Sequence, residues 1–408
     1  MKIRKLSLEN FRAFEKLELE AGNRLTLLIG ENGKGKTSIL DAIAVALGAI
    51  PTHLPGVIGT SFKKTDLRQS NNKPSPFMRV RIQSDAGISW DRLERRDKKL
   101  NFNLLFPEVL GLYLLKDYIQ KNILDPMMAE ESFELPVFSY YGVNRALLDV
   151  PLSKKGFPKT HKRLEAYANA LNATSRFRSA FIWFYNKENE ELRHQKELQS
   201  FDFKLAELET IRKAIGKMFK DLKDPHVLTN PLRFVLKYGD EVLDITQLSD
   251  GYKTLLSLVI DLASRMALAN PHLEDPLNAP AIVLIDEIDL HLHPEWQKII
   301  VGQFLEVFPN AQFFITTHSP YIIESVNNLL MKHKLQTRNI RSDNIINEIY
   351  PLSPDDTRVY YCESDKISSL LDPELLLIDD KLIHPFNSIS SQYDQMSELL
   401  QKHEDTMS

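Results

Sequence analysis

The sequence has few of the features that tie a chain to an oxidising compartment or to a membrane. Its one cysteine, Cys362, excludes a disulfide bond within the chain and is typical of a reducing compartment. The N-terminus returns to charged residues before any apolar run develops, so we expect no secretory leader. The most apolar long stretch, residues 255–269, contains Asp261 and Arg265 and falls short of the roughly 20 residues of a membrane-spanning helix. We therefore expect a cytoplasmic protein without membrane contact.

Neither sign of charge dominates the chain. Lys and Arg total 51 against 55 Asp and Glu, which gives a net charge of −4. This balance argues against a protein that coats nucleic acid through charge alone. Direct binding of nucleic acid through a local basic patch stays an open alternative. The 408 residues, 43% of them hydrophobic, suffice for a large core and more than one structural lobe.

The pattern of apolar residues predicts an α/β core near the N-terminus. Three strands are expected there, at residues 6–9, 17–20 and 25–29. A helix should follow, because apolar residues recur at helical spacing over residues 38–47 before Gly48 and Pro51 end the pattern. Residues 77–95 predict a β-hairpin. Its second strand mixes basic with acidic residues, which favours a solvated face over a DNA contact.

Residues 160–225 are rich in Lys, Glu, Leu and Ala and are expected to be mostly helical. An apolar stripe steps by three and four residues from Leu205 to Leu222. The segment is far too short for the long coiled coils of chromosome-structuring proteins, so we interpret it as a helical arm or lid. Packing of the stripe within the arm is favoured over packing against a partner.

A phosphate-binding loop is the strongest motif in the chain. Residues 30–37, Gly-Glu-Asn-Gly-Lys-Gly-Lys-Thr, fit its pattern without mismatch, between an expected strand and an expected helix. Its glycines let backbone N–H groups turn inward around a phosphate that side chains would block. Lys36 would reach the β- and γ-phosphates of ATP, and the hydroxyl of Thr37 would hold Mg²⁺. The candidate nucleotide-binding residues here are Gly30, Asn32, Gly33, Gly35, Lys36, Thr37 and Ser38.

Two acidic residues supply the other half of such a site. Residues 281–285 predict a buried strand, and Asp286 and Glu287 follow at its carboxyl end, where parallel sheets bind ligands. We expect Asp286 to hold the metal and Glu287 to act as general base on the attacking water. The alternative is a solvent-exposed strand end that carries two acids, which the phosphate-binding loop in the same chain disfavours.

Ser249 and Gly251 stand at the expected N-terminus of a helix, in Leu248-Ser249-Asp250-Gly251-Tyr252. Free backbone N–H groups and the helix dipole make such an N-terminus an anion site. The two residues alone favour this interpretation no more than the simpler one, in which Ser249 only caps the helix.

His318 follows an expected strand at residues 313–317. It is a candidate catalytic residue, with capping of the next helix as the alternative.

Together these motifs resemble those of the ABC ATPases. Residues 248–252 resemble the ABC signature, which contacts the γ-phosphate bound to the opposite subunit. Asp289 lies in the place of the D-loop, which crosses the dimer interface, and His318 in that of the switch histidine. The resemblance covers residues 1–50 and 245–325. It implies that two copies bind ATP between them.

The opening segment narrows the resemblance. Residues 8–14, Leu-Glu-Asn-Phe-Arg-Ala-Phe, look like the RecF and SMC group rather than transporter ATPases, and in that group an Arg in the place of Arg12 approaches the nucleotide. Residues 289–294 together with 316–320 are typical of OLD-like defence ATPases. The PtuA ATPases of Septu and retron anti-phage systems, which act with an HNH nuclease, are similar in two segments, residues 135–145 and 181–190. Asn144-Arg145 would occupy the Q-loop position.

The resemblance implies an α/β fold of the ABC-type ATPase head. Such a head has a parallel sheet core with a phosphate-binding loop and an antiparallel β subdomain, here with an inserted helical arm and a small C-terminal extension. We expect an N-terminal ATPase lobe, a helical arm or lid, a C-terminal ATPase lobe and an extension open to partner binding, at residues 1–158, 159–228, 229–330 and 331–408.

The expected function is that of an ATPase that uses ATP and Mg²⁺, forms a homodimer or larger homo-oligomer around ATP, and regulates a separate HNH nuclease in anti-phage defence. We predict no nuclease site in this chain, because Glu363 and Asp379-Asp380 are too close in sequence for the nuclease domain of OLD-like proteins to lie between them. The alternatives are a RecF-like repair ATPase that clamps DNA, and a scaffold that binds ATP and rarely hydrolyses it.

Overall fold

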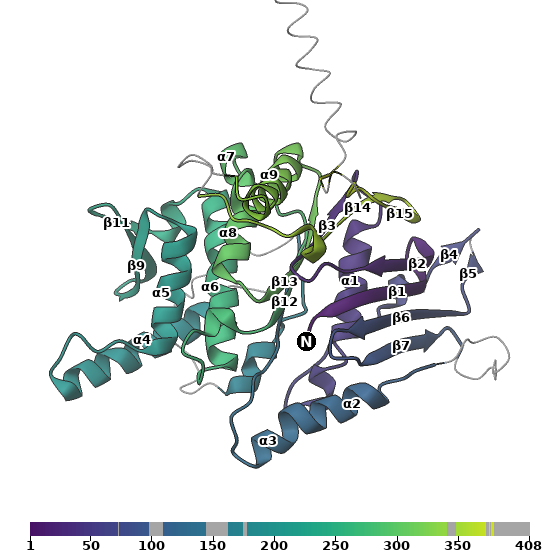
Figure 1. The fold of residues 1–408 in the computed structure, drawn as a ribbon. Coiled ribbons are helices and arrows are strands. Elements are labelled where there is room, and N and C mark those ends of the chain that lie inside the picture. Colours follow the sequence, from purple (N-terminus) through teal and green to yellow (C-terminus); the bar gives the residue numbers. More distant parts are fainter. Residues whose placement is uncertain are drawn as a thin grey trace, which may run out of the picture.

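A computed structural model describes residues 1–71, 73–97, 109–143, 162–173, 178–340, 348–372, 375 and 377–378 of the chain (Figure 1). Two features of the sequence, Asn144-Arg145 and Asp379-Asp380, lie outside these residues. No helix in the described part of the chain is long and apolar enough to cross a membrane.

Six strands form the central sheet, in the order β15-β14-β3-β13-β12-β8. All of them run parallel except β15, which pairs antiparallel with β14. Their bounds are β3 (Leu25–Ile29), β8 (Val137–Tyr141), β12 (Ala281–Ile285), β13 (Ala311–Thr317), β14 (Thr357–Glu363) and β15 (Lys366–Ser369). Every residue of β3, β8, β12 and β13 is buried, as expected for parallel strands that are covered on both faces.

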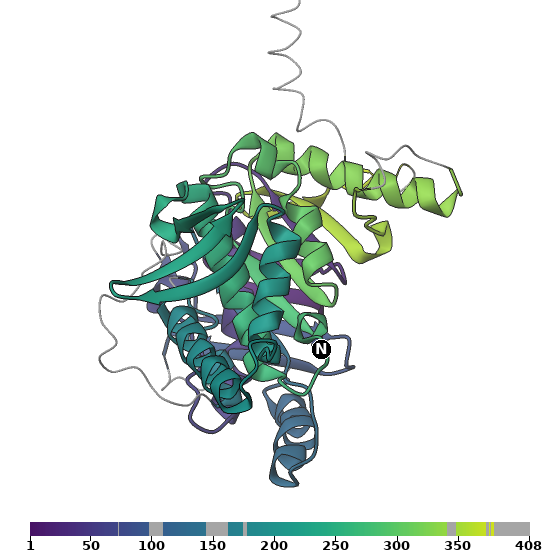
Figure 2. The ribbon, with the colours of Figure 1, turned by 90° about the vertical axis from the view of Figure 1, so that its left-hand side faces the viewer.

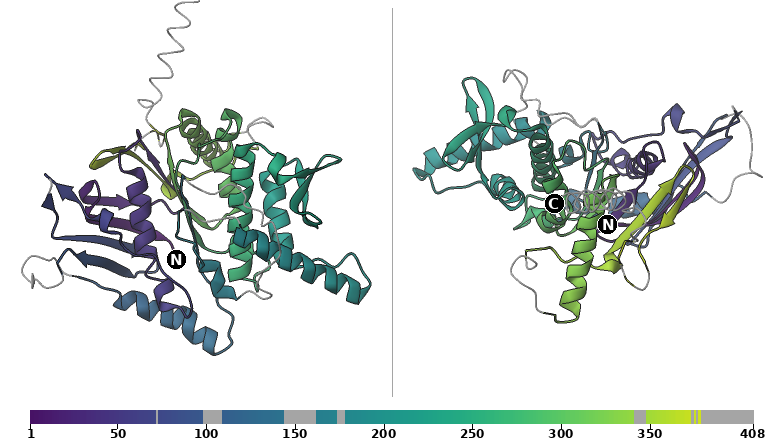
Figure 3. Two further views of the ribbon diagram at one scale, coloured as in Figure 1. Left: turned by 180° about the vertical axis from the view of Figure 1, so that it is seen from behind. Right: turned by 90° about the horizontal axis from the view of Figure 1, so that it is seen from above.

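A second, antiparallel sheet has the order β2-β1-β6-β7. Its strands are β1 (Ile3–Phe11), β2 (Phe14–Glu20), β6 (Phe77–Ser84) and β7 (Ser89–Arg95), and a small hairpin, β4 (Gln69–Ser70) and β5 (Lys73–Pro74), precedes β6. The helix α1 (Lys36–Leu47) lies between the two sheets and contacts β1 and β6 on one side and β13 on the other (Figure 3). The expected N-terminal strands, the helix that ends at Gly48 and the hairpin at residues 77–95 are confirmed. So is the expected combination of a parallel core with an antiparallel β subdomain.

Helices cover the other face of the central sheet. The longest in contact with it, α6 (Asp250–Ala269), packs on β8, and α5 (Ala206–Met218) packs on α6 and α8 (Ile300–Val307). A three-stranded sheet flanks α5, and in Figure 2 these teal elements lie in front of the central sheet. The remaining bounds are α2 (Tyr113–Ile119), α3 (Asp125–Met128), α4 (Arg178–Leu198), β9 (Leu222–Thr229), β10 (Leu232–Tyr238), β11 (Glu241–Asp244), α7 (Pro294–Gln297) and α9 (Pro320–Thr337).

The apolar stripe of α5 does not pack only within an arm, and that expectation was wrong. Its residues Leu208, Ile211 and Ile215 are fully buried in a helix whose neighbours include α6 and α8. The stripe faces these helices because both carry buried apolar residues along their length, whereas α4 extends away from the body (Figure 1).

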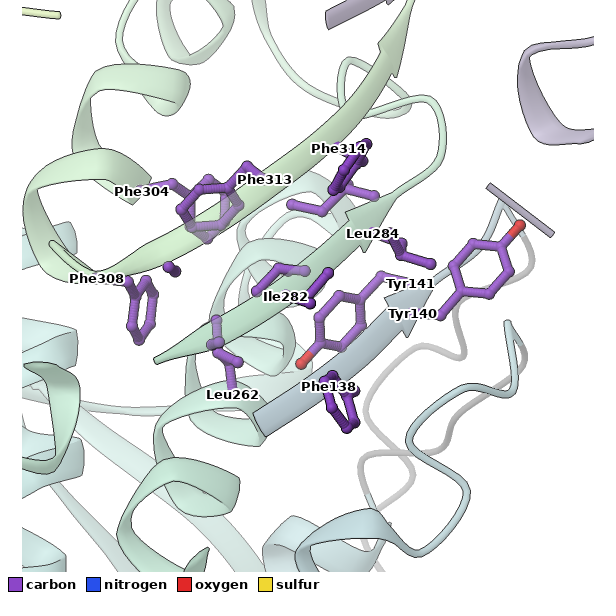
Figure 4. Packing of buried hydrophobic residues seen from close by; sticks show 14 of the residues in the cluster. Phe138, Tyr140, Tyr141, Leu262, Ile282, Leu284, Phe304, Phe308, Phe313 and Phe314 are labelled. Atoms are coloured by element: carbon purple, nitrogen blue, oxygen red, sulfur yellow. The ribbon is translucent and has the colours of Figure 1, made fainter. Parts of the chain in front are cut away.

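The core between sheet and helices is rich in aromatic rings. Phe304 on α8 packs against Phe313 on β13 with ring centroids 5.8 Å apart. On β8, Tyr140 and Tyr141 point to opposite faces of the sheet, as successive strand residues must (Figure 4). One strand therefore contributes to the packing on both sides.

The position of β14 corrects the expectation that residues 331–408 form an extension outside the ATPase lobes. Thr357–Glu363 pairs in parallel with β3, so it is an inner strand of the central sheet. Val359 and Cys362 are buried in its core. The strand carries no motif, and its short apolar run of four residues, 359–362, does not by itself indicate a place inside a parallel sheet.

A buried ion pair within α6 is joined to β8 by the hydroxyl of Tyr141. The guanidinium of Arg265 donates from Nε to Oδ2 of Asp261 at 2.8 Å, and the hydroxyl of Tyr141 donates to the same oxygen at 2.8 Å. Both side chains of the pair are less than a tenth exposed. The backbone carbonyls of Ala166 and Ala168 accept from the other side of Arg265.

Arg265→Ala should lower the free energy of unfolding by about 3–5 kcal/mol, because it leaves the carboxylate of Asp261 buried without its cation. Urea denaturation followed by circular dichroism measures the loss. The control is Lys298→Ala, which removes an exposed pair with Glu295 and should change stability by less than about 1 kcal/mol. Equal losses for the two variants would contradict the structural role of the buried pair.

Candidate active site

Three loops converge at one edge of the central sheet. They follow β3, β13 and β12, which are adjacent and parallel. The three strands end at nearly the same level of the sheet, because Thr317 pairs with Ile29 and Ile285 pairs with Ile315. The sheet thereby gathers the phosphate-binding loop, His318 and the two acids Asp286 and Glu287, which are far apart in sequence.

The phosphate-binding loop packs against Cys362 on β14 and against Phe14 on β2. A side chain at Gly30 would place its Cβ 2.7 Å from the carbonyl oxygen of Cys362. At Gly35, where φ is 88°, it would lie 2.7 Å from the ring of Phe14. Burial raises the pKa of the Cys362 thiol to about 12, so this side chain stays protonated against the loop. The loop has its shape because glycine alone fits at both positions.

Lys36 and the N-terminus of α1 form a cradle for an anion. The ammonium of Lys36 donates to the loop carbonyls of Gly30 at 2.6 Å and Glu31 at 2.9 Å, and the residue is 5% exposed. Gly35 begins α1 without a side-chain cap, so no side chain occupies the helix N-terminus. The open N–H groups, the helix dipole and one fixed cation suit a phosphate. Asn32 and Gly33 lie exposed on the rim, and Ser38 lies half-buried in the first turn of α1.

Asp286 connects the loop to the two neighbouring strands. Its Oδ2 accepts a hydrogen bond from Thr37 at 2.8 Å, and its Oδ1 accepts one from Thr316 at 2.6 Å. The same hydroxyl oxygen of Thr316 accepts from the backbone N–H of Glu287 at 2.7 Å. Glu287 has φ 46°, in the left-handed region that a non-glycine residue adopts at a cost of about 1–2 kcal/mol. A hydroxyl and a carboxylate in contact are oxygen ligands of the kind that Mg²⁺ prefers.

His318 is fixed by the loop that follows Glu287. Its Nδ1 lies 3.3 Å from Oδ2 of Asp289, whose other oxygen accepts from the hydroxyl of Thr317. The carboxylate of Asp289 is buried, whereas the His318 side chain is 51% exposed. The ring is therefore oriented from within the chain and presents its other nitrogen outward.

Ser249 and Gly251 lie at the N-terminus of α6, as predicted. Ser249 is exposed, and its hydroxyl accepts from the backbone N–H of Tyr252 at a long 3.5 Å. A Cβ at Gly251 would lie 2.6 Å from the carbonyl oxygen of His291, so this turn packs directly on the loop after Asp289. Within the described part of the chain, no hydrogen bond or ion pair joins this helix end to residues 30–38.

Arg12 borders a cavity of about 1270 Å³ beside α1. Its guanidinium pairs with Asp41 at 2.5 Å and Asp66 at 2.8 Å, and although burial alone lowers the pKa of Arg12, the two carboxylates raise it overall. Tyr140 also lines the cavity. Burial, followed by the charges of Asp41 and Asp286, raises the pKa of its hydroxyl far above the ordinary value.

Two residues of this site were missed from the sequence. Asp41 follows Thr37 by one helical turn, and that spacing places both on one face of α1. Thr316 is the penultimate residue of β13, where only its contact with Asp286 across the sheet distinguishes it from a core residue. Among the described residues, no cluster of three or more His, Cys, Asp or Glu side chains is placed to hold a metal ion.

Two family models match the chain, and curated proteins of known families are similar to it. The family model described as "AAA domain" matches residues 5–223, and that of "AAA domain, putative AbiEii toxin, Type IV TA system" matches residues 150–324. A similar curated protein is the "Retron Vc95 probable ATPase" of Vibrio cholerae, 28% identical over 80% of this chain and 72% of the relative. Another is the "Septu protein PtuA" of Bacillus mycoides, 26% identical over 78% of this chain and 38% of the relative.

Among solved structures, an SMC head bound to the C-terminal winged-helix domain of ScpA overlaps with 91% of this chain and 98% of its own. The sequence identity is 17% and the TM-score is 0.46.

Thr316→Val should lower the free energy of unfolding by about 1–3 kcal/mol, because it deletes the hydroxyl that bonds Asp286 and the backbone of Glu287 in a buried place. Urea denaturation measures the change. Thr246→Val is the matched control, since its hydroxyl also donates to an aspartate but is exposed. A Thr316→Val variant as stable as this control would contradict the bridging role.

Proposed function

Because the chain belongs to the AAA domain family, and is therefore an ATPase, we propose that it hydrolyses MgATP in a site completed by a second copy. We further propose that its nucleotide state controls a separate HNH nuclease in anti-phage defence. The contact that carries the nucleotide assignment is the hydrogen bond between Thr37 and Asp286. It joins the phosphate-binding loop to the acidic strand end at 2.8 Å.

The residues fit a triphosphate with its metal. Lys36 and the N–H groups at the start of α1 would bind the phosphates, with Gly30, Gly33 and Gly35 shaping the loop. Mg²⁺ at the Thr37 hydroxyl would neutralise phosphate charge, and Asp286 would hold it. The hydroxyl of Thr37 and the carboxylate of Asp286, which lie 2.8 Å apart, are the residues that would hold the metal.

Glu287 is the proposed general base. Its backbone is fixed by Thr316, and the carboxylate follows the metal-holding Asp286 directly. A carboxylate so placed accepts a proton from water as that water attacks the γ-phosphate. His318, oriented by Asp289, would contact the γ-phosphate from the neighbouring strand end.

The second copy would supply its Ser249 and Gly251. In one chain this helix N-terminus is exposed and makes no bond to the loop that binds the phosphates. The N–H groups at this helix start and the helix dipole can bind an anion from outside the chain. A head-to-head pair would use this anion site on each copy to close over ATP on the other.

The defence role rests on the named relatives, a retron ATPase and a Septu PtuA protein. Resemblance to the PtuA ATPases implies a separate HNH nuclease as the partner. We propose two docking regions for it, the protruding helix α4 in the arm predicted over residues 159–228, and the part of the predicted extension 331–408 that follows β15. Most of this second region lies outside the described residues. Recovery of DNA without a nuclease would favour the RecF-like clamp instead.

Glu287→Gln should retain ATP binding and slow hydrolysis about 10²- to 10⁴-fold, because the amide cannot accept the proton of water. Phosphate release at saturating MgATP measures the rate, and equilibrium dialysis measures binding. Lys36→Ala is the reference that should lose binding itself. Normal hydrolysis by the Gln variant would show that Glu287 is not the base.

Ser249→Arg should abolish turnover while ATP still binds to a single chain, since the signature acts only on nucleotide held by the other copy. Steady-state phosphate release and binding of a labelled ATP analogue separate the two effects. Parallel loss of both activities would overturn the signature assignment.

The partner is tested by capture of a tagged Glu287→Gln chain from its native host in MgATP, followed by mass spectrometry. We expect an HNH nuclease in the complex, and the same capture without ATP reports whether nucleotide controls the association. Recovery of the chain alone in both conditions would contradict the defence assignment while leaving the ATPase site intact.

A further inference from the structure

Three aromatic rings meet beside the N-terminus of α6. Tyr252 follows Gly251 on α6, Trp296 lies on the short helix α7, and Phe219 directly follows α5. The ring centroids of Tyr252 and Trp296 are 5.1 Å apart in an edge-to-face arrangement, and that of Phe219 lies 5.3 Å from Trp296 and 5.9 Å from Tyr252. All three separations lie in the range of about 4.5–7 Å that aromatic pairs prefer. We call these three residues the aromatic triad.

Two of the three rings are fixed by their own surroundings. Phe219 is 2% exposed and continues the buried stripe of α5, which packs on α6 and α8. Trp296 is followed by Gln297, whose side-chain NH₂ donates to the carbonyl oxygen of Leu292 at 2.7 Å. The side-chain oxygen of Gln297 accepts from the hydroxyl of Ser319 at 2.5 Å. Helix α7 is thereby tied to the end of β13, so Trp296 and Phe219 offer Tyr252 a firm base.

Tyr252 connects this base to the residues that would face a second copy. Its backbone N–H donates to the hydroxyl of Ser249, and its side chain packs on the hydrophobic core, whereas Ser249 and Asp250 are exposed. The same turn touches the preceding loop at Gly251, where a Cβ would lie 2.6 Å from the carbonyl oxygen of His291. That steric contact limits how closely the turn approaches the loop, and the aromatic triad supplies the attraction that holds it there.

The aromatic triad holds a part of the chain that is separate from its own phosphate-binding loop. Among the described residues, the start of α6 makes no hydrogen bond or ion pair with residues 30–38. Loss of the triad should therefore leave the ATP affinity of a single chain unchanged. In the proposed composite site, Ser249 and Gly251 act on ATP that the other copy holds, so the loss should be felt at that nucleotide.

We propose that Trp296 is a positioning residue for the ATP bound to the other copy. It holds Tyr252, and through Tyr252 the start of α6, in the place where Ser249 and Gly251 reach that nucleotide. The proposal rests on the proposed function, because it requires a composite site. Trp296 itself touches neither nucleotide. Since a displacement of about 1 Å can cost about 10²-fold in rate, loss of this ring lowers turnover.

The test uses two chains that are each inactive alone. A donor chain carries Lys36→Ala and can offer only its Ser249 and Gly251, and an acceptor chain carries Ser249→Arg and can offer only its phosphate-binding loop. Mixed in MgATP, they form a heterodimer with one complete site, and phosphate release measures its turnover. A mixture as inactive as its components would refute the composite site of the proposed function, and the role of Trp296 with it, before Trp296 is changed.

The same substitution is then placed in either chain of an active mixture. Trp296→Ala in the donor chain should lower turnover about 10- to 100-fold. In the acceptor chain it should change turnover by less than about twofold, because it is distant from the one complete site, and this result also shows that the variant folds. Trp296→Phe in the donor chain keeps a ring beside Tyr252 and should restore most of the turnover.

Titration of the donor chain against a fixed amount of acceptor chain separates positioning from association. Trp296→Ala should lower the plateau of turnover. An unchanged plateau with a shifted midpoint would mean that the ring only supports binding of the two copies to each other. That result, equal losses from both chains, or no loss from the donor chain would each overturn the proposal while leaving the composite site intact.

Discussion

The carboxylate of Asp286 is the point on which the site depends. Its two oxygens accept from Thr37 at the start of α1 and from Thr316 on β13, while its own backbone N–H donates to the carbonyl of Tyr141 on β8. One buried acid thus fixes the relative positions of the phosphate-binding loop, the strand that leads to His318, and the edge of the sheet. A buried charge with these partners is costly to displace, so the arrangement exists before any ligand arrives.

The two sides of the sheet have different roles around this centre. On the helical side, the Asp261–Arg265 pair and the aromatic core, part of which Figure 4 shows, hold α6 in place. Ser249 lies exposed at the N-terminus of this helix. On the other side α1 is packed between two sheets, and Asp41 on this helix pairs with Arg12 in the turn between β1 and β2.

Much of the core could be predicted from the sequence because its motifs are local. Three elements each show a recognisable pattern within about a dozen residues. They are the loop at residues 30–37, the buried strand before Asp286 and the helix after Ser249. What sequence reasoning missed depends on contacts between distant segments. β14 joins β3 in the sheet without a motif of its own, and Thr316 and Asp41 acquire their roles only when β13 and the β1–β2 turn are brought beside them.

The central claim, that a second copy completes the site, is tested most directly by crosslinking. One batch of chain carries Asn32→Cys on the rim of the phosphate-binding loop and another carries Ser249→Cys, both exposed positions, while the native Cys362 is buried with a raised pKa and stays unreactive. A bifunctional thiol reagent added to the mixture should yield a covalent heterodimer with MgATP and none without it. Absence of the heterodimer under conditions in which both chains bind ATP would contradict the composite site.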